Sequence, residues 1–260
     1  MKPVLMDIRD RQHLWKLFDN WEETMIWSCL QGHMGEAWAD DRENPKSAQI
    51  INGDFCFFAG EPDRELVLNI PNCHIILAPQ NDAWERLIED IYGENIRKIV
   101  RYAIKKERDI FDQEKLSKIV ELLNEDYELK LIDEAIYEQI MQNSWSRDLC
   151  SQFKDYKDYE KRGLGAAVLY KGQVVSGASS YTIYDEGIEI EIDTREDHRR
   201  RGLALACGAR LILECLKRGL YPSWDAHNRW SVALAEKLGY HFDKEYTVYT
   251  VDNIRYSVYK

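Results

Sequence analysis

The sequence has little of what a metal site or a disulfide framework needs. Its six cysteines include no C-x-x-C pair, and none stands at zinc-ligand spacing with a histidine. This excludes the common zinc and redox motifs, so we expect no bound metal. Cysteines without such a pattern are typical of reduced core residues in a cytosolic protein. They are Cys29, Cys56, Cys73, Cys150, Cys207 and Cys215.

The chain also lacks long apolar runs and an excess of positive charge. No run approaches membrane-spanning length, and the opening MKPVLMDIRD has no apolar segment of the kind that signal peptides carry. The formal net charge of −11 argues against broad binding to nucleic acid or to an anionic membrane surface. With 45% hydrophobic residues among 260, the sequence predicts a globular, cytoplasmic protein with a sizeable core.

No repeat, low-complexity segment or Pro- and Gly-rich linker divides the chain. Polar residues at 124–127 are the best candidate boundary, so we expect a mixed α/β domain over 1–126 and a second domain over 127–260. In the first domain, apolar periodicity and turn residues predict strands at 3–8, 47–61 (two, joined by a turn), 73–79 and 95–106, and helices at 11–21, 81–93 and 113–125.

The second half of the chain has a clearer pattern. Its predicted order is β-α-β-β-β-α-β-α-β-β, which indicates an α/β fold with a mixed sheet. The predicted strands cover 127–133, 163–184 (a hairpin), 187–194, 221–227 and 241–260 (a closing hairpin), and the predicted helices cover 134–143, 202–217 and 228–239.

The stretch HRRRGLA places three arginines directly before Gly202 and a helical pattern. Cations are unfavourable at a helix N-terminus, where unpaired N–H groups already carry partial positive charge. A bound polyanion would offset that charge, because N–H groups and arginine side chains both bind phosphates. A solvated basic loop is the alternative. Neither G-x-x-x-x-G-K-[ST] nor G-x-G-x-x-G is present, which excludes those two phosphate-binding motifs.

Two of these segments resemble motifs of one enzyme superfamily. RRRGLA, at 199–204, matches the Arg/Gln-x-x-Gly-x-Gly/Ala signature of the GNAT N-acetyltransferases, and NRWSVALAEKLGY, at 228–240, resembles their Asn-led second motif. The predicted strand order is also similar. The resemblance implies a GNAT acetyltransferase fold over 127–260, with the N-terminal domain as a companion. EIEIDTREDHRRRGLA, YPSWDAHN and INGDFCFFAG resemble a narrower bacterial branch that includes zwittermicin-resistance acetyltransferases.

The resemblance implies acetyl-CoA as co-substrate and assigns residues to it. The backbone of 192–194 would pair with the pantetheine arm, and the N–H groups of 201–204 would bind the pyrophosphate with help from the side chains of 199 and 200. Asn228 matches a position that holds pantetheine or the catalytic water, although it is also a good helix N-cap. The implied residues are Ile192, Asp193, Thr194, Arg199, Arg200, Arg201, Gly202, Leu203, Ala204, Asn228 and Ser231.

A row of carboxylates precedes this segment. Glu189, Glu191 and Asp193 alternate with isoleucines, so they share one face of a strand at intervals of roughly 7 Å. Acetyl transfer needs a base, because an alkylammonium has a pKa of about 10. Mutual repulsion and partial burial would raise the pKa of at least one member of the row. We expect Glu191, then Glu189, to be catalytic, with Asp225 and His227 as second choices; a solvated sheet face is the alternative.

One position departs from the family pattern. Many members carry a tyrosine seven residues after the motif asparagine, as an acid for the departing sulfur, and this chain has Ala235 there. Tyr240, Tyr246 and Tyr249 are candidate replacements, or the thiolate leaves unaided. The catalytic acid is therefore unassigned.

Together these features predict an acetyl-CoA-dependent N-acetyltransferase acting on a primary amine of a small molecule, such as an antibiotic or metabolite. A protein or peptide acetyltransferase is an alternative within the same class. A non-catalytic acyl-CoA-binding regulatory module is another, which the missing tyrosine favours. A nucleic-acid-binding role for the arginines is disfavoured by the net charge and by the lack of aromatics within the cluster. The acceptor amine and the oligomeric state are not defined by the sequence.

Overall fold

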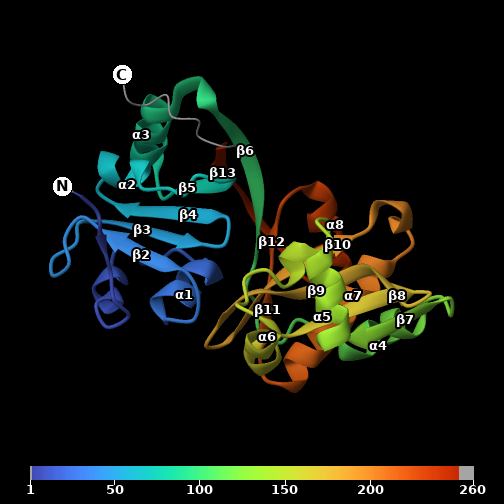
Figure 1. Ribbon diagram of the computed structural model, residues 1–260. Helices are drawn as coiled ribbons and strands as arrows, with labels where there is room; N and C mark the ends of the chain where they lie inside the picture. The colour runs from blue at the N-terminus through green and yellow to red at the C-terminus, as the bar shows by residue number, and fades with distance from the viewer. Residues whose placement is uncertain (1, 252–260) are drawn as a thin grey trace. The chain divides into compact units, whose positions relative to one another are not determined.

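The computed structural model describes residues 2–251, and the chain forms two compact units (Figure 1). Unit 1 comprises the residues up to Arg101 together with those from Glu245 onward, and unit 2 comprises Tyr102–Lys244. The chain therefore leaves unit 1 and returns to it. Each unit is described here by itself.

Unit 1 is built on strands in the order β1-β2-β3-β4-β5-β13. Neighbouring strands are antiparallel except for β4 and β5, which run parallel. The strands are β1 (Val4–Leu5), β2 (Glu36–Ala39), β3 (Ser47–Asn52), β4 (Phe55–Gly60), β5 (Ile75–Pro79) and β13 (Phe242–Val251), and β6 (Ile96–Ile104) leads on into unit 2. The helices are the 3-10 turn η1 (Arg11–Leu14), α1 (Thr24–Leu30), α2 (Arg64–Leu68), α3 (Asp82–Tyr92) and η2 (Gly93–Asn95).

Strand β4 is buried on both faces, and its successive side chains point alternately into two layers of the core. Cys56 and Phe58 belong to a buried cluster with residues of α2 and α3, including the fully buried Trp84. Phe57 points to the other face, where the Trp21 ring meets it edge-on with the ring centroids 5.8 Å apart. A strand buried on both sides needs an unbroken apolar sequence, and FCFFA in β4 provides it.

Local signals predicted most of unit 1. The expected pair of strands over 47–61 is present as β3 and β4, and Asn81 caps α3 by accepting hydrogen bonds from the N–H groups of Ala83 and Trp84. Helix α1 escaped prediction because six of its seven residues are buried, which leaves no amphipathic period to detect.

The predicted helix over 11–21 is wrong, because only Arg11–Leu14 form a helical turn there. The Arg11 guanidinium is buried and donates to the carbonyl oxygens of Cys29, at 2.7 Å, and Gly35, at 3.3 Å. These long-range bonds anchor the segment against the rest of unit 1, and Asn20, with φ of 62°, lies outside helical geometry. Tertiary contacts here override the apolar periodicity.

Unit 2 contains a mixed sheet in the order β11-β10-β9-β8-β7. All its pairings are antiparallel except β10 with β11. Its strands are β7 (Tyr127–Leu131), β8 (Gly165–Tyr170), β9 (Gln173–Tyr184), β10 (Gly187–Thr194), β11 (Tyr221–Ser223) and the short β12 (Asp225–Ala226). Its helices are α4 (Gln113–Glu121), α5 (Glu134–Gln142), η3 (Arg147–Leu149), α6 (Tyr156–Arg162), η4 (Glu196–His198), α7 (Leu203–Lys217) and α8 (Arg229–Leu238).

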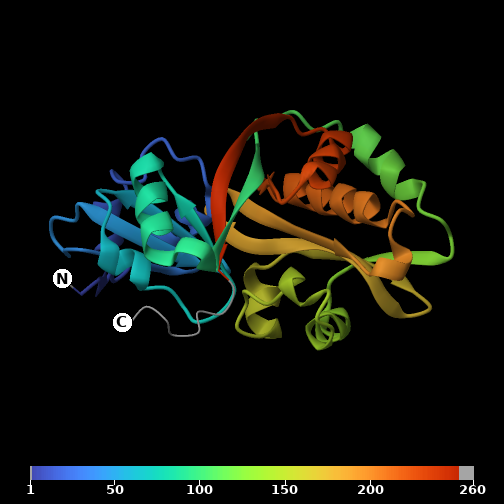
Figure 2. The same ribbon diagram turned by 90° about the horizontal axis from the view of Figure 1, so that it is seen from above.

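Helices cover both faces of the unit 2 sheet. Figure 2 shows α7 on one face, with α4 and α8 beside it, and α5 and α6 on the other. The buried face of α7 carries small residues, including Ala206, Cys207 and Ala209. At Gly208 an added Cβ would come within 2.8 Å of Leu238 in α8, so glycine allows the two helices to pack closely.

The predicted element order is confirmed from β7 to α8 except at two places, whereas the first strand of the predicted closing hairpin, β13, pairs with β5 in unit 1. The single short strand expected at 221–227 is two strands: β11 pairs with β10, whereas β12 leaves that sheet and pairs with Tyr102 and Ala103 of β6. Helix α6 and the 3-10 turns were not predicted. Residues 254–260 of the expected closing hairpin lie outside the described residues.

The division into units differs from the boundary expected at 126/127. Helix α4 and the segment before it belong to unit 2, because α4 packs along α7. An amphipathic helix shows in sequence that it has a partner but not which one, and the partner of α4 lies about 90 residues further along the chain.

Candidate active site

Strands β10 and β11 are paired along only the first part of β10. They pair from Gly187 to Glu189 against Tyr221 to Ser223, and no further pairing of β10 with β11 is present in the described residues. Strand β10 continues to Thr194 along β9, whereas the chain after Ser223 turns away into β12. The result is a fork in the sheet, which leaves one edge of β10 without a neighbouring strand beyond Glu189.

A loop with unusual backbone geometry connects the end of β10 to α7. We call residues 199–205 the anion loop. Arg200 has φ of 62° and Gly202 has φ of 78°, so two left-handed residues alternate with others. Such alternation points successive N–H groups into one concave surface that binds anions. Nothing lies within 4 Å of a Cβ added at Gly202, so the positive φ is the reason for glycine there.

Within the anion loop only the Arg199 N–H has a partner in the described residues, the carbonyl oxygen of Glu196 at 3.2 Å. In the part of the chain that the structure describes, the backbone N–H groups of residues 200–205 donate no hydrogen bond, and α7 has no side-chain cap. The first N–H of the segment to find a helical acceptor belongs to Ala206, which donates to the carbonyl oxygen of Gly202 at 3.0 Å. Several donors at one helix N-terminus form a ready anion site.

A pocket of about 310 Å³ adjoins these N–H groups. It is formed by the end of β10, the anion loop and one face of α8. The face of α8 that lines the pocket carries residues at i, i+4 and i+7, namely Trp230, Leu234 and Lys237. This helical spacing is visible in the sequence, so it could have shown that the three residues share a face. The full lining is Thr194, His198, Arg199, Arg200, Gly202, Leu203, Ala204, Leu205, Trp230, Leu234 and Lys237.

The three arginines of the loop have different surroundings. Arg200 lines the pocket with its guanidinium 5.8 Å from the centre of the exposed Trp230 ring. Arg199 also lines the pocket, but its Nε donates to the carbonyl oxygen of Thr194 at 3.2 Å. Arg201 is turned towards β7, where it donates to the Tyr127 hydroxyl at 3.0 Å. Two of the three arginines thus line the pocket, and the side chain of the third is bonded within the protein.

The two predicted cofactor residues of α8 take part in local structure. The Asn228 side chain accepts hydrogen bonds from the N–H groups of Trp230 and Ser231, at 2.9 and 3.0 Å, so the N-cap expected from the sequence is present. The Ser231 hydroxyl accepts a hydrogen bond from the Trp224 indole at 3.1 Å. Asn228 keeps its amide N–H₂ group, and Ser231 its O–H, as donors for a further partner.

The carboxylates of β10 share one face but not one environment. Their partners on β9 are Thr182 for Glu189, Ser179 for Glu191 and Gly177 for Asp193. The bulge between the first two pairs passes over Tyr181 of β9, so β10 itself keeps its alternation. Glu189 is buried, 4% exposed, whereas Glu191 and Asp193 are half-buried.

Two buried hydroxyls flank Glu189 in the same row across the sheet. Thr182 on β9 and Ser223 on β11 both pair with Glu189, and both are almost fully buried. Within the described residues, Thr182 Oγ1 and Ser223 Oγ have no hydrogen-bond partner. Native proteins satisfy most buried polar groups, so hydroxyls of this kind are characteristic of functional sites. They lie where the fork opens.

Burial raises the pKa of Asp193 above its ordinary value of 3.8. The Thr194 N–H, which donates to Asp193 Oδ1 at 2.6 Å, and the positive charge of Arg199 oppose that shift. The expectation that one member of the row has a raised pKa is thus met at Asp193, with burial rather than mutual repulsion as the first cause.

Replacing Asp193 with asparagine should therefore stabilise the protein at pH 7. A carboxyl whose pKa is raised by folding binds its proton more tightly in the folded state, so it costs stability as pH rises above 3.8. Asparagine keeps the oxygen that accepts from Thr194. We expect a higher melting temperature for Asp193→Asn at pH 7 and a smaller gain as pH is lowered towards 4. A variant less stable than the parent at pH 7 would show that the charge is favourable.

The tyrosines proposed as the catalytic acid are engaged elsewhere. Tyr240 is fully buried and donates to the carbonyl oxygen of Pro222 at 2.6 Å, and burial raises its pKa far above 10. Tyr249 lies in unit 1, where its hydroxyl donates to Glu89 at 2.5 Å. Ala235, at the family's tyrosine position, is completely buried. We therefore assign neither Tyr240 nor Tyr249 as the catalytic acid. Tyr246, the third candidate, belongs to unit 1, as Tyr249 does.

The second-choice bases lie on the other branch of the fork. Asp225 is half-buried in β12, where it pairs with Ala103, and His227 is exposed between β12 and α8. Neither belongs to the row on β10.

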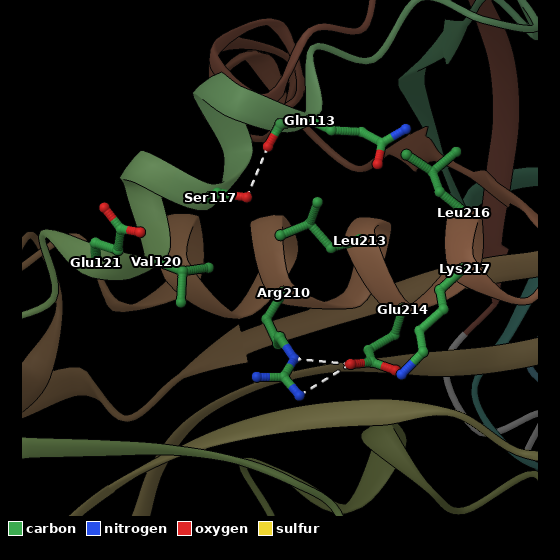
Figure 3. A pocket seen from close by; sticks show the side chains of 9 residues that line it. All are labelled: Gln113, Ser117, Val120, Glu121, Arg210, Leu213, Glu214, Leu216 and Lys217. Carbon is green, nitrogen blue, oxygen red and sulfur yellow. Dashed lines mark hydrogen bonds and ion pairs between the residues drawn. The ribbon is translucent and has the colours of Figure 1, made fainter.

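A second pocket, of about 510 Å³, lies between α4 and the C-terminal half of α7 (Figure 3). Some of its polar groups are already bonded: Arg210 pairs with Glu214 at 2.9 Å, and the Ser117 hydroxyl donates to the carbonyl oxygen of Gln113 at 2.8 Å. It is larger than the pocket at the anion loop, but its lining includes no residue of the anion loop or of the carboxylate row.

The described residues contain no candidate metal site and no membrane-spanning helix. Residues 2–251 hold no group of three or more His, Cys, Asp or Glu side chains placed to bind a metal ion. No helix within the same range has the length and apolar character needed to cross a membrane.

Comparison with known proteins identifies this arrangement. The profile of the GNAT acetyltransferases matches residues 15–249. The uncharacterized N-acetyltransferase YdfB of Bacillus subtilis (strain 168) is 29% identical over 252 residues, or 89% of this chain and 91% of that protein. A GCN5-related N-acetyltransferase-like protein from Streptococcus suis 89/1591 is 50% identical, with a TM-score of 0.88 over 93% of this chain and 98% of that one.

More distant structures share the fold alone. A GCN5-related N-acetyltransferase from Sphaerobacter thermophilus is 13% identical, with a TM-score of 0.56 over 95% of each chain. Members of the family typically use acyl-CoA. The profile match spans most of the sequence and includes both the forked sheet and the anion loop, so this chain belongs to the GNAT acetyltransferase family and is an N-acetyltransferase.

Proposed function

We propose that the protein transfers an acetyl group from acetyl-CoA to a primary amine of a small molecule, with both substrates bound together. The observation that carries the proposal is the set of unbonded N–H groups at 200–205, which adjoin a pocket lined by Arg199, Arg200 and Lys237. Clustered N–H donors with nearby cations suit a diphosphate, because each oxygen can accept hydrogen bonds in an electropositive site.

The pantetheine arm of the cofactor would lie in the fork, along the open edge of β10. The pantetheine arm carries amide groups, and the edge of β10 beyond Glu189 offers backbone groups with no strand against them. Ile192, Asp193 and Thr194 are the residues we assign to that pairing. Asn228 and Ser231, at the start of α8, have donors left to contribute from the opposite side. The exposed Trp230 ring and Lys237 provide an apolar surface and a charge for the nucleotide end.

The carboxylate row supplies the proton acceptor. When bound, acetyl-CoA provides the activated acyl group, so the chain must position an amine and remove its proton. Glu191 is the first carboxylate past the fork and is half-buried, which leaves it accessible to an incoming amine. Glu189 sits at the fork itself, buried between Thr182 and Ser223. We assign Glu191 as the base and Glu189 as the alternative.

The same row of carboxylates also indicates what kind of acceptor substrate the protein binds. Glu189, Glu191 and Asp193 lie on one face of β10, and negative charge attracts a cationic amine. The segments that resemble the zwittermicin-resistance branch include this row, which supports a small aminated metabolite or antibiotic as substrate. A panel of such amines in a thiol-release assay would identify it, and turnover of peptide amines alone would replace this proposal with a peptide acetyltransferase.

Acetyl-CoA at millimolar concentration is expected to raise the melting temperature by several degrees. A ligand that binds only the folded state stabilises it by about 2.7 kcal/mol at 100 times its Kd. Adenosine 3′,5′-diphosphate, which lacks the pyrophosphate and pantetheine, should give a smaller shift. The measurement is thermal denaturation across a titration of each compound, and no shift with acetyl-CoA would overturn the cofactor assignment.

A further inference from the structure

Two tyrosine rings enclose the histidine that precedes the arginines. His198, in η4, is only 5% exposed. Its ring centre lies 5.8 Å from that of Tyr127, the first residue of β7, and 5.2 Å from that of Tyr170, the last residue of β8. The two tyrosine rings are themselves 5.3 Å apart. Residues of β7 and β8 thus pack against His198, directly before the anion loop.

A chain of hydrogen bonds runs through this cluster. Arg201 donates from one nitrogen to the Tyr127 hydroxyl at 3.0 Å and from the other to the carbonyl oxygen of Asp197 at 3.1 Å. The Tyr127 hydroxyl lies 3.2 Å from His198 Nδ1. Arginine can only donate, so the tyrosine oxygen accepts from Arg201 and its O–H is left to donate to Nδ1. That donation requires the neutral tautomer of His198 with its proton on Nε2, which is 3.7 Å from Asp197 Oδ2.

The charges around His198 agree with a neutral ring. Burial lowers the pKa of His198 below 6.5, and the positive charges of Arg195 and Arg201 lower it further. The negative charge of Asp197 acts in the opposite direction. The other groups packed on the ring are the phenol rings of Tyr127 and Tyr170.

The residue between the two anchored arginines is strained. Arg200 has φ of 62°, a left-handed conformation that is unfavourable for a residue with a side chain. On one side Arg199 is bonded to Thr194, and on the other Arg201 is bonded to Tyr127. These two anchors hold the backbone on either side of Arg200, whose conformation gives the loop its concave row of N–H groups.

We propose that Tyr127 and His198 are positioning residues, which hold the anion loop in its binding conformation by anchoring Arg201. Tyr127 does so from a strand that begins more than 70 residues earlier in the chain. The proposal rests on acetyl-CoA as the ligand of the loop. It separates the role of Arg201 from that of Arg199 and Arg200: the first shapes the loop, whereas the other two face the ligand.

The test is the Kd for acetyl-CoA, measured by calorimetry on a set of single variants. Tyr127→Phe keeps the ring but removes the hydroxyl, and should raise Kd roughly tenfold. His198→Ala should do the same. His198→Asn places an oxygen acceptor where Nδ1 was, and should restore Kd to within about threefold of the parent. Because neither side chain touches reacting atoms, kcat at saturating acetyl-CoA should change less than about twofold in all three.

Tyr170→Phe is the matched control. It removes a hydroxyl from the same ring cluster, but no hydrogen bond involves the Tyr170 hydroxyl in the described residues, so Kd should stay at the parent value. The double variant Tyr127→Phe/His198→Ala should bind no more weakly than the weaker single variant, because the two residues act through one chain of bonds. An additive loss would mean two independent contributions and would overturn the proposal.

A nitrogen NMR spectrum of the free protein adds a readout that needs no cofactor. His198 should show the Nε2–H tautomer in the parent, and Tyr127→Phe should change the tautomer ratio. If acetyl-CoA binds the parent but Tyr127→Phe binds equally well, the positioning role is wrong and the cofactor assignment stands. If acetyl-CoA does not bind the parent, the cofactor assignment fails and this proposal fails with it.

Discussion

Replacing Glu191 with glutamine is expected to lower kcat by about 10²- to 10³-fold, while the KM for acetyl-CoA changes little. Glutamine keeps the size and hydrogen-bonding capacity of the side chain but cannot take a proton at neutral pH. Glu191 lies past the point where β10 and β11 separate, on the face that carries the other carboxylates. A group needed only while the amine loses its proton affects kcat and leaves cofactor binding intact.

The pH profile distinguishes a base from a structural carboxylate. In the parent, kcat/KM should fall on the acidic side as the base becomes protonated, and Glu191→Gln should lose that dependence. Glu189→Gln is the matched variant, since it makes the same chemical change two residues away on the same face. We expect it to lower kcat about tenfold and to keep the acidic limb, because Glu189 is buried between Thr182 and Ser223.

An unchanged pH profile with near-parent kcat in Glu191→Gln would remove Glu191 as the base. If Glu189→Gln then lost the acidic limb, Glu189 would take the role. If both variants kept the acidic limb, the next candidates for the base would be Asp225 and then His227, on the other branch of the fork.

Features with local causes were predictable from the sequence. Helix α8 begins at Asn228 because its side chain caps two N–H groups, and it ends at Gly239 because φ there is 110°. Both depend on residues within one turn, so the sequence shows them directly. The alternation on β10 is equally local, and it predicts correctly which carboxylates share a face.

Features that depend on distant partners were not predictable. The split of 221–227 into β11 and β12 requires Tyr102 and Ala103, more than 100 residues earlier in the chain. The same holds for Arg201, whose side chain leaves the pocket because Tyr127 offers an acceptor 74 residues away. Nothing in the run of three arginines distinguishes the one that braces the loop from the two that face the pocket. The periodicity of α8 could have revealed Trp230 and Lys237, but not that the partner of Trp230 across the pocket is Arg200.

Replacing Arg200 with glutamate should raise the Kd for acetyl-CoA about 100-fold or more. Arg200 lines the pocket at the N-terminus of α7, and its guanidinium lies over the Trp230 ring. Hydrogen bonds to charged groups are worth about 1.5–3 kcal/mol, which corresponds to roughly 10- to 150-fold in Kd, and a negative charge in the same place adds repulsion. The folded protein should lose little stability, because a carboxylate near a helix N-terminus is favourable.

The control is Arg108→Glu, which makes the same change of charge at an exposed residue of unit 2 that does not line the pocket. It should leave Kd within about twofold of the parent, whereas a long-range effect of net charge would weaken binding in both variants. The Arg200 variant should also retain the parent's melting temperature without ligand. Calorimetric titration and thermal denaturation of the three proteins measure both quantities. If Arg200→Glu binds acetyl-CoA as tightly as the parent, the loop is a solvated connection between β10 and α7. The N–H groups of 200–205 then need another ligand to explain why the chain leaves them unbonded.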